Sequence, residues 1–320
     1  MDGVFGNIKI ISGTSNPALA ESIAKHLGLP LCDAEVTKFS DGEIALNINE
    51  SVRGADVYII QSTGAPSNDN LMELLIMCDA MRRASAGRIN AVIPYYGYAR
   101  QDRKAKSHDP ISAKLVANLI TKAGADRVIT MDLHSSQIQG FFDIPLDHLV
   151  GVNLIADYFR SLNLDNSVIV APDAGSVKRT RHLAKIFNLP FALIDKERPR
   201  PNETAVMNVI GEIKGKNCFM LDDMIDTAGT ICTGADALMQ LGAKSVHAGC
   251  THGVFSGPAR ERIAKSGITE LISLDTLAIP DEATFPKLKV LHTGEIFANC
   301  IKRIHFGQSL SDLFEVPRYS

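Results

Sequence analysis

The chain has 320 residues, of which 45% are hydrophobic and 22% are charged, and its formal net charge is −3. This length fits two domains of ordinary size, and the composition is typical of a globular protein. The small negative charge gives no reason to expect nucleic-acid or membrane partners, and no apolar run is long enough to span a bilayer. Six scattered cysteines without a C-x-x-C pair, and a start without a basic signal segment, predict a cytoplasmic protein with reduced thiols.

Short apolar runs alternate with helical patterns along the first half of the chain. Asn16 and Pro17 are typical of a helix start and Gly28 of a helix end, so a helix is predicted between them. The strands predicted in this half cover residues 8–11, 57–60, 89–93 and 128–131. Two further helices are expected to begin at Asn70 and at Pro110.

The same alternation restarts after Gly151 with a predicted helix at residues 152–162. The strands predicted in this half cover residues 168–171, 191–194, 219–221, 246–249 and 271–273. Strands that alternate with helices form mostly parallel sheets, so the predicted fold class is α/β with two successive helix-flanked sheets. We place the domain boundary so that residues 1–149 form one domain and residues 150–320 the other.

The polar turn at residues 39–43, Phe-Ser-Asp-Gly-Glu, has two interpretations. Asp-Gly is a strong turn pair, so the segment predicts the tip of a β-hairpin. Alternatively, Phe39 offers an aromatic face to a nucleobase, while Asp41 and Glu43 accept hydrogen bonds from exocyclic amines or ribose hydroxyls.

A cationic and aromatic loop at residues 94–104 follows a predicted strand. It could be solvated, or it could contact nucleic acid through interleaved Tyr and Arg, but the second needs a wider basic face than the net charge suggests. Arg100 suits a nucleotide phosphate better, because its planar guanidinium can bind phosphate oxygens bidentately.

Asp132 and His134 follow the predicted strand at residues 128–131. Side chains two apart on a strand share a face, so we expect this carboxylate and imidazole to reach one metal ion or its waters. The alternative is that His134 has a purely structural role. A second carboxylate, Asp173, follows the strand at residues 168–171 and is also a candidate metal ligand.

Two basic segments lie in the second half of the chain. On the helix predicted after Asp173, we expect Lys178 and Arg179 to point inward and the other basic residues to meet solvent or an interface. Lys196 and Arg198 begin a Pro-rich stretch that should be irregular and exposed. It is either a charged surface loop or a lid that brings cations to the acidic segment further along.

That acidic segment, residues 218–241, has an apolar strand pattern, then Asp222 and Asp223, then a turn at 226–230 leading into a helical pattern. The amides at a helix N-terminus favour a phosphate, and Gly229 lets the backbone approach it closely. The acidic pair would repel that phosphate, so we expect it to hold sugar hydroxyls or a hydrated divalent cation. An ordinary strand–turn–helix with a solvated loop is the alternative. A Walker site is excluded, because the Lys-Ser/Thr pair is missing.

Taken together, these segments resemble the ribose-phosphate pyrophosphokinase family, of the class I bacterial type, over nearly the whole chain. The motifs that carry the resemblance are Phe-Ser-Asp-Gly-Glu at 39–43, Ser-Val-Arg-Gly at 51–54, Tyr-Ala-Arg-Gln-Asp at 98–102, Met-Asp-Leu-His at 131–134, Pro-Asp-Ala-Gly at 172–175, Asp-Lys-Glu-Arg at 195–198 and Asp-Asp-Met-Ile-Asp-Thr-Ala-Gly-Thr at 222–230. The last motif also resembles the phosphoribosyl-diphosphate loop of type I phosphoribosyltransferases. The resemblance therefore implies two tandem domains of that fold.

The resemblance further implies transfer of the diphosphoryl group of Mg-ATP to the 1-hydroxyl of ribose 5-phosphate, giving 5-phosphoribosyl 1-diphosphate and AMP. In the first domain it implies ATP-binding residues, namely Phe39, Asp41, Gly42, Glu43, Arg100 and Gln101. In the second it implies residues for ribose 5-phosphate, namely Arg198, Asp222, Asp223, Asp226, Thr227, Ala228, Gly229 and Thr230. The implied Mg²⁺ ligands are His134, Asp173 and Asp132, and the implied catalytic residues are Lys196 and Arg198. A homo-hexamer, with ADP and inorganic phosphate as allosteric effectors, is also implied.

Three rival functions share parts of this pattern. A phosphoribosyltransferase that consumes the diphosphate would share the loop at 222–230 but has no evident need for the ATP-like motifs of the first half. A silent regulatory relative is disfavoured because Lys196, Arg198, His134 and Asp173 are all present. A ligand-sensing transcription regulator is disfavoured because no DNA-binding segment is visible.

Overall fold

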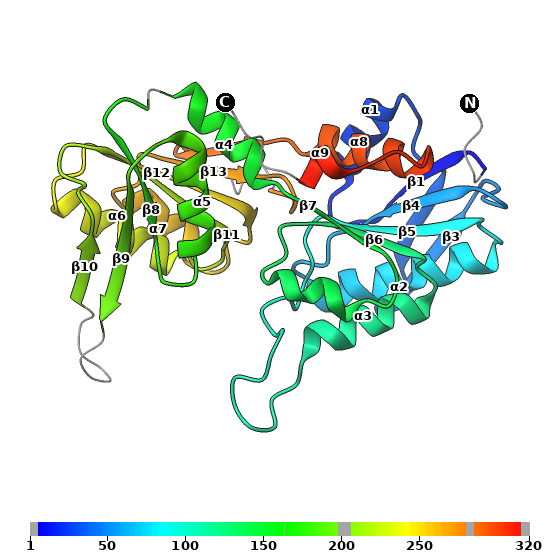
Figure 1. The fold of residues 1–320 in the computed structure, drawn as a ribbon. Helices are drawn as coiled ribbons and strands as arrows, with labels where there is room; N and C mark the ends of the chain where they lie inside the picture. Colours follow the sequence, from blue (N-terminus) through cyan, green and yellow to red (C-terminus); the bar gives the residue numbers. More distant parts are fainter. Residues whose placement is uncertain (1–5, 163, 198–205, 280–284, 315–320) are drawn as a thin grey trace. The chain divides into compact units, whose positions relative to one another are not determined.

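The structure is a computed structural model that describes residues 6–162, 164–197, 206–279 and 285–314 (Figure 1). Its contacts divide the chain into two compact units. The first unit holds the described residues of Met1–Gly151, Thr276–Ala278 and His292–Val316. The second unit holds those of Val152–Asp275 and Ile279–Leu291.

The first unit is built on a five-stranded parallel sheet with the order β1-β4-β5-β6-β7. Its strands are β1 (Ile8–Ser12), β4 (Asp56–Ile60), β5 (Arg88–Ile93), β6 (Arg127–Met131) and β7 (Leu146–Leu149). Every residue of β4 is buried, as expected for an inner strand covered on both faces. A separate antiparallel hairpin joins β2 (Ala34–Lys38) to β3 (Ile44–Ile48).

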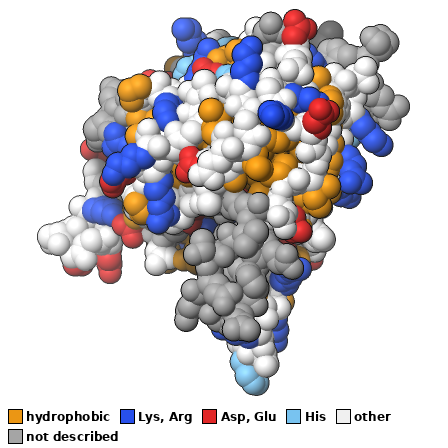
Figure 2. Space-filling model, turned by 90° about the vertical axis from the view of Figure 1, so that its left-hand side faces the viewer, with side chains coloured by type: hydrophobic (Ala, Val, Ile, Leu, Met, Phe, Trp, Pro, Cys, Tyr) orange, Lys and Arg blue, Asp and Glu red, His pale blue; other side chains and the backbone are white. Residues whose placement is uncertain are grey.

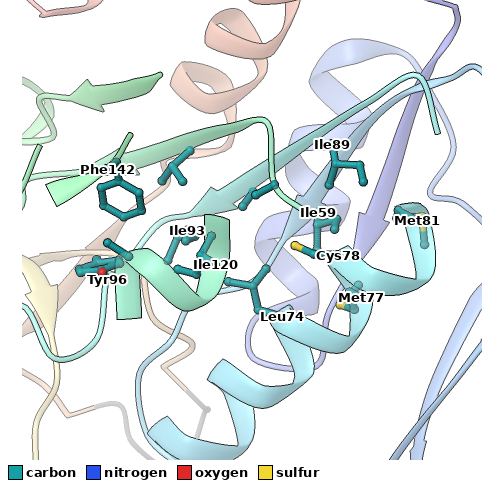
Figure 3. Packing of buried hydrophobic residues seen from close by; sticks show 14 of the residues in the cluster. Ile59, Leu74, Met77, Cys78, Met81, Ile89, Ile93, Tyr96, Ile120 and Phe142 are labelled. Carbon is teal, nitrogen blue, oxygen red and sulfur yellow. The ribbon is translucent and has the colours of Figure 1, made fainter. Parts of the chain in front are cut away.

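Helices cover both faces of this sheet (Figure 1). They are α1 (Pro17–Leu27), α2 (Ser67–Arg83), α3 (Ser112–Ala123), α8 (Gly294–His305) and α9 (Ser311–Phe314), with a 3₁₀ turn η1 (Ser136–Phe141). One core cluster joins α2 and α3 to the sheet, and Figure 3 shows Leu74 and Met77 of α2 close to Ile59 of β4. At its edge, the rings of Tyr96 and Phe142 meet edge-on with centroids 5.7 Å apart.

Helix α1 begins and ends where the sequence predicted. The Asn16 side chain accepts a hydrogen bond from the Leu19 N–H at 3.3 Å, and Pro17 occupies the first helical position. Gly28 ends the helix with φ of 68°, a left-handed conformation that glycine adopts at little cost. These are local signals, which is why the sequence alone located this helix.

Helix α8 follows the second unit in sequence, but it belongs to the first unit and packs on α1. Its apolar face is buried, and the Ile301 carbonyl accepts a hydrogen bond from the Tyr58 hydroxyl at 3.4 Å. The predicted division placed residues 150–320 in the second domain. The structure differs here, because α8 lies beside α1 on the same face of the first unit's sheet and helps to cover it (Figure 1).

The second unit is built on a seven-stranded sheet with the order β10-β9-β8-β11-β12-β13-β14. Its strands are β8 (Ser167–Ala171), β9 (Phe191–Glu197), β10 (Val206–Ile210), β11 (Asn217–Ile225), β12 (Ser245–Gly253), β13 (Glu270–Leu274) and β14 (Leu288–Leu291). All neighbours are parallel except β9 and β10, which form an antiparallel pair. Strands β10 and β14 lie at the two edges and were not predicted.

In the described part of the second unit, the helices that flank this sheet are α4 (Val152–Ser161), α5 (Val177–Phe187), α6 (Gly229–Gln240) and α7 (Ala259–Lys265). Helices α6 and α7 share a core cluster with Met220 of β11. Phe219, which points to the opposite face of the strand, packs on Phe159 of α4 with ring centroids 4.9 Å apart. Figure 2 shows hydrophobic side chains lying among Lys and Arg side chains on the side that faces left in Figure 1.

The predicted fold class, α/β with mostly parallel sheets flanked by helices, is confirmed. No helix in the described part of the chain is long and apolar enough to cross a membrane.

Candidate functional site

The turn that joins β11 to α6 opens a helix N-terminus, an arrangement whose chemistry suits an anion. Ala228 precedes the helix with φ of 58°, a left-handed conformation that costs a residue with a Cβ about 1–2 kcal/mol. The first helical hydrogen bond runs from the Cys232 N–H to the Ala228 carbonyl at 3.1 Å. Within the described chain, no side chain caps this helix. The amides of the first turn therefore point towards the loop, at the positive end of the helix dipole.

Neighbouring elements hold this turn in place. Arg262 of α7 donates through Nη1 to the Thr227 carbonyl at 3.0 Å, and the Ser256 N–H donates to the Asp226 carbonyl at 3.0 Å. The Thr227 and Thr230 side chains are exposed, whereas Ala228 is buried. The backbone is thus fixed while the two hydroxyls stay accessible to a ligand.

The acidic pair closes β11 just before this turn. Asp223 is buried and Asp222 is half-buried, and the Asp223 N–H donates to Asp222 Oδ1 at 2.9 Å. Burial and the neighbouring Asp223 carboxyl raise the pKa of Asp222 to about 8. Arg179 of α5 faces both carboxylates, with Nη1 3.3 Å from Asp223 Oδ1 and 3.8 Å from Asp222 Oδ1.

Two neighbouring strands bring further predicted site residues to the same edge of this sheet. Asp173 follows β8, which pairs with β11, and its Oδ1 accepts a hydrogen bond from the Ser176 N–H at 2.8 Å. Lys196 lies in β9, which pairs with β8. Because the carboxyl ends of parallel strands meet at one edge, the acidic pair, Asp173 and the end of β9 share that edge.

One expectation about the basic stretch changes with the structure, and another cannot be followed in it. Lys196 is part of β9, because the antiparallel pairing with β10 extends this strand to Glu197; the segment is not irregular there. Arg198, the other predicted catalytic residue, lies outside the described residues.

In the first unit, the segment at residues 39–43 forms the hairpin tip between β2 and β3. The Phe39 N–H donates to the Glu43 carbonyl at 2.8 Å, and Gly42 adopts φ of 93°. The turn predicted from Asp-Gly is therefore confirmed. Phe39 is 60% exposed, and Asp41, Gly42 and Glu43 are exposed beside it, so an aromatic face and two carboxylates are available to a ligand.

The loop after β5 carries Arg100 and Gln101, both exposed. Gln101 is tied to the start of α3, where its Oε1 accepts from the Ser112 hydroxyl at 2.5 Å and its carbonyl accepts from the Ala113 N–H at 3.2 Å. Strand β5 pairs with β6, which precedes Asp132. Arg100, Gln101 and Asp132 thus follow the carboxyl ends of adjacent parallel strands.

The prediction that Asp132 and His134 share a strand face is wrong. Strand β6 ends at Met131, and Asp132 turns away with φ of 36°. The turn is held by the Asp132 N–H, which donates to the Leu149 carbonyl at 3.0 Å, and by the Leu133 N–H, which donates to His148 Nε2 at 2.8 Å. The two residues are therefore close in sequence but are positioned by a turn. Among the described residues, no group of three or more His, Cys, Asp or Glu is placed to hold a metal ion.

Sequence reasoning missed three features of this region. They are the left-handed backbone at Ala228, the support from Arg262, and the reach of Arg179 to both carboxylates. The expectation that Arg179 points inward gave a partial signal for the last. The other two depend on tertiary contacts that no motif in the chain encodes.

The two α/β units match a known class of proteins, the phosphoribosyl diphosphate synthetases. A crystal structure of phosphoribosylpyrophosphate synthetase from Mycobacterium smegmatis matches this fold with a TM-score of 0.89 at 43% identity, covering 93% of this chain and 98% of that one. The family model for the N-terminal domain of ribose phosphate pyrophosphokinase matches residues 8–124. The phosphoribosyl synthetase-associated domain matches residues 195–315.

Two relatives found by sequence similarity agree with these matches. The chain is 60% identical to a ribose-phosphate pyrophosphokinase of Clostridium perfringens over 318 residues, which is 98% of this chain and 100% of the relative. It is 56% identical to that of Bacillus subtilis over 308 residues, covering 96% and 97%. The chain belongs to the ribose-phosphate pyrophosphokinase family, which confirms the predicted membership.

Proposed function

We propose that this protein is a ribose-phosphate diphosphokinase that makes 5-phosphoribosyl 1-diphosphate for nucleotide biosynthesis. The observation that carries the proposal is the turn between β11 and α6, where left-handed Ala228 opens a helix N-terminus directly after an acidic pair. Helix amides suit a phosphate, and carboxylates suit sugar hydroxyls. A pentose 5-phosphate carries both groups at a fixed separation.

The second unit would hold the acceptor. The 5-phosphate would meet the amides and hydroxyls of Asp226, Thr227, Ala228, Gly229 and Thr230, while Asp222 and Asp223 accept from the ribose hydroxyls, with Arg198 contributing a cation. This arrangement fixes the sugar at both ends, so the 1-hydroxyl is held in one place. Positioning of this kind supplies much of the rate enhancement in phosphoryl-type transfer.

The first unit would hold ATP. Exposed Phe39 would stack on the adenine, with Asp41, Gly42 and Glu43 beside it and Arg100 and Gln101 on the phosphates. Stacking on an aromatic ring and bidentate binding by a guanidinium are ordinary means of holding a nucleotide. We likewise propose that the first unit, which includes α8, serves the nucleotide and that the second unit serves ribose 5-phosphate.

The metal would be Mg²⁺, with His134 and Asp132 as candidate ligands in the first unit and Asp173 as a candidate ligand in the second. The half-buried carboxylates of Asp132 and Asp173 fit this ion, which takes one or two carboxylates and otherwise keeps its waters. When bound, it would neutralise charge on the triphosphate oxygens.

In the reaction, the ribose 1-hydroxyl oxygen forms a bond to the β-phosphorus of ATP and loses its proton. The bond between that phosphorus and the bridging oxygen of the α-phosphate breaks, and AMP leaves. Lys196 and Arg198 would stabilise the negative charge that develops on the transferred group.

The remaining parts of the proposal rest on family membership. They are a homo-hexamer, allosteric response to ADP and inorganic phosphate, and a cytoplasmic location. The six cysteines, all buried free thiols, are consistent with the last. Size measurement in solution and kinetics against both effectors would test the first two.

One assay tests the function. Purified protein with ATP, Mg²⁺ and ribose 5-phosphate should release AMP and 5-phosphoribosyl 1-diphosphate in equal amounts, and omission of ribose 5-phosphate should abolish both. A protein that forms neither product, but consumes 5-phosphoribosyl 1-diphosphate with a nucleobase, would instead be a phosphoribosyltransferase.

A further inference from the structure

Arg179 of α5 is directed at the acidic end of β11. Its guanidinium lies 3.3 Å from Asp223 and 3.8 Å from Asp222, and its side chain is 33% exposed. Arg181, two residues further along the same helix, is exposed and lies over the Phe191 ring, 5.1 Å from the centroid. Arg179 is therefore not simply one member of a solvated basic face.

The helix that carries Arg179 is firmly anchored. Thr180 is fully buried, and its hydroxyl donates to the Ser176 carbonyl at 2.9 Å. The Ser176 N–H in turn donates to Asp173 Oδ1 at 2.8 Å, which fixes the start of α5 after β8. Because β8 and β11 are paired neighbours, this anchoring also places the backbone of Arg179 within reach of the acidic pair.

Two adjacent carboxylates at a partly buried strand end repel each other unless a cation is near. Arg179 supplies a positive charge within 4 Å of both. On the neighbouring strand β12, Cys250 is the register partner of Asp222 and His252 that of Met224, and both are buried, whereas His247 lies further back beside Phe219. Cys250 has its pKa raised to about 12 by burial, so at neutral pH it adds no charge.

We propose that Arg179 is a positioning residue of the ribose 5-phosphate site, which pairs with Asp222 and Asp223 and orients their oxygens towards the sugar hydroxyls. The identity of the sugar rests on the function proposed above. Arg179 acts through the carboxylates and not on the transferred group. Its loss therefore weakens sugar binding and leaves the chemical step largely unchanged.

The test compares Arg179→Gln and Arg179→Lys with Lys185→Gln, an exposed residue of the same helix that loses the same charge. Arg179→Gln should raise both the KM and the calorimetric Kd for ribose 5-phosphate by about ten-fold, with kcat changed less than about three-fold. Arg179→Lys should recover part of the loss, since it keeps the charge without the planar fork. Lys185→Gln should behave like the unchanged protein.

A double-mutant cycle tests whether Arg179 acts through the pair. The Arg179→Gln/Asp223→Asn protein should lose less affinity than the product of the two single losses, because each change already breaks the same ion pair. Independent losses would overturn the proposal, as would an unchanged Kd in Arg179→Gln. A fall in kcat with Kd unchanged would also overturn it, because that result would mean that Arg179 acts on the transferred group and not on sugar binding.

Calorimetry with ribose 5-phosphate and Mg²⁺, without ATP, separates this inference from the proposed function. If the unchanged protein binds the sugar but releases no AMP, the proposed function fails and Arg179 is still tested by Kd. If AMP is released but Arg179→Gln binds normally, the inference fails alone. Should circular dichroism show that Arg179→Gln is unfolded, Arg179→Lys and Asp223→Asn decide the matter by the same Kd criterion.

Discussion

The imidazole of His305, the last residue of α8, lies with Nδ1 2.8 Å from Oδ2 of Asp56, the first residue of β4, across 249 positions of sequence. Asp56 is fully buried and also accepts two hydrogen bonds from Arg88, at 2.7 Å and 2.6 Å. Burial alone would raise the pKa of Asp56, but the hydrogen bonds from Arg88 and His305 outweigh burial and lower it.

This buried carboxylate gives the first prediction. Asp56→Ala should destabilise the protein by about 3–5 kcal/mol, because it removes the fully buried carboxylate that contacts Arg88 and His305 and so breaks this largely buried ion pair. Thermal unfolding followed by circular dichroism would measure the loss. The control is Asp79→Ala, which breaks an exposed pair with Arg83 and should change stability by less than about 0.5 kcal/mol. Equal losses in the two variants would contradict the argument.

A second prediction concerns catalysis by Lys196. Lys196→Ala should lower kcat by roughly 10²–10³ while the KM for ribose 5-phosphate changes little. In the proposed role, the lysine ammonium stabilises negative charge that develops on the transferred group only as the reaction proceeds. Steady-state kinetics would separate the two constants, with Lys185→Ala as the control on an exposed lysine. A large rise in KM at constant kcat would remove Lys196 from the chemical step.

The backbone at Ala228 gives a third prediction. Ala228→Val should weaken ribose 5-phosphate binding, because a β-branched residue at φ of 58° is strained by about 1–2 kcal/mol or more and would distort the turn. Ala228→Gly is the matched control and should keep its affinity, since glycine adopts this conformation readily. Calorimetry on both variants measures the difference, and equal affinities would show that the left-handed turn is not needed.

The fourth prediction concerns acid stability. Hydrogen bonds from the Lys9 ammonium and the Asp33 N–H lower the pKa of Glu50 to about 2. A carboxyl whose folded pKa lies below its unfolded value of about 4.3 stabilises the protein above that value, and this contribution is lost as the pH falls towards 2. Glu50→Gln should therefore lower the Tm at pH 6, and the gap to the unchanged protein should narrow by pH 3. A gap that is constant over this range would mean that Glu50 contributes no charge-dependent stability.

Local signals located much of the fold in advance. Asn16, Pro17 and Gly28 act on the few residues around them, so the bounds of α1 could be predicted. The edge strand β10 was missed, because its pairing with β9 joins segments on either side of a Pro-rich stretch. For the same reason, Lys196 was expected in a loop and lies in a strand.

In the candidate site too, features set by neighbouring residues could be predicted, and features set by distant residues could not. The acidic pair and the turn into α6 are contiguous, and their chemistry could be predicted from residue types. The contact between Arg179 and Asp223 joins positions 44 apart, and it depends on how α5 settles beside β11. The strand before Asp132 was predicted to end at residue 131, as β6 does, but the face-sharing rule for strands was then applied to Asp132 and His134 beyond that end, where a turn positions them.

The return of α8 to the first unit governs how this chain can be divided for study. A fragment that ends at Gly151 would expose the side of α1 on which α8 rests, and would leave Asp56 without His305. A fragment that carries residues 292–314 on a short linker after Gly151 should restore both contacts. The gene for the isolated first unit would thus have to be assembled from two separate stretches of the coding sequence.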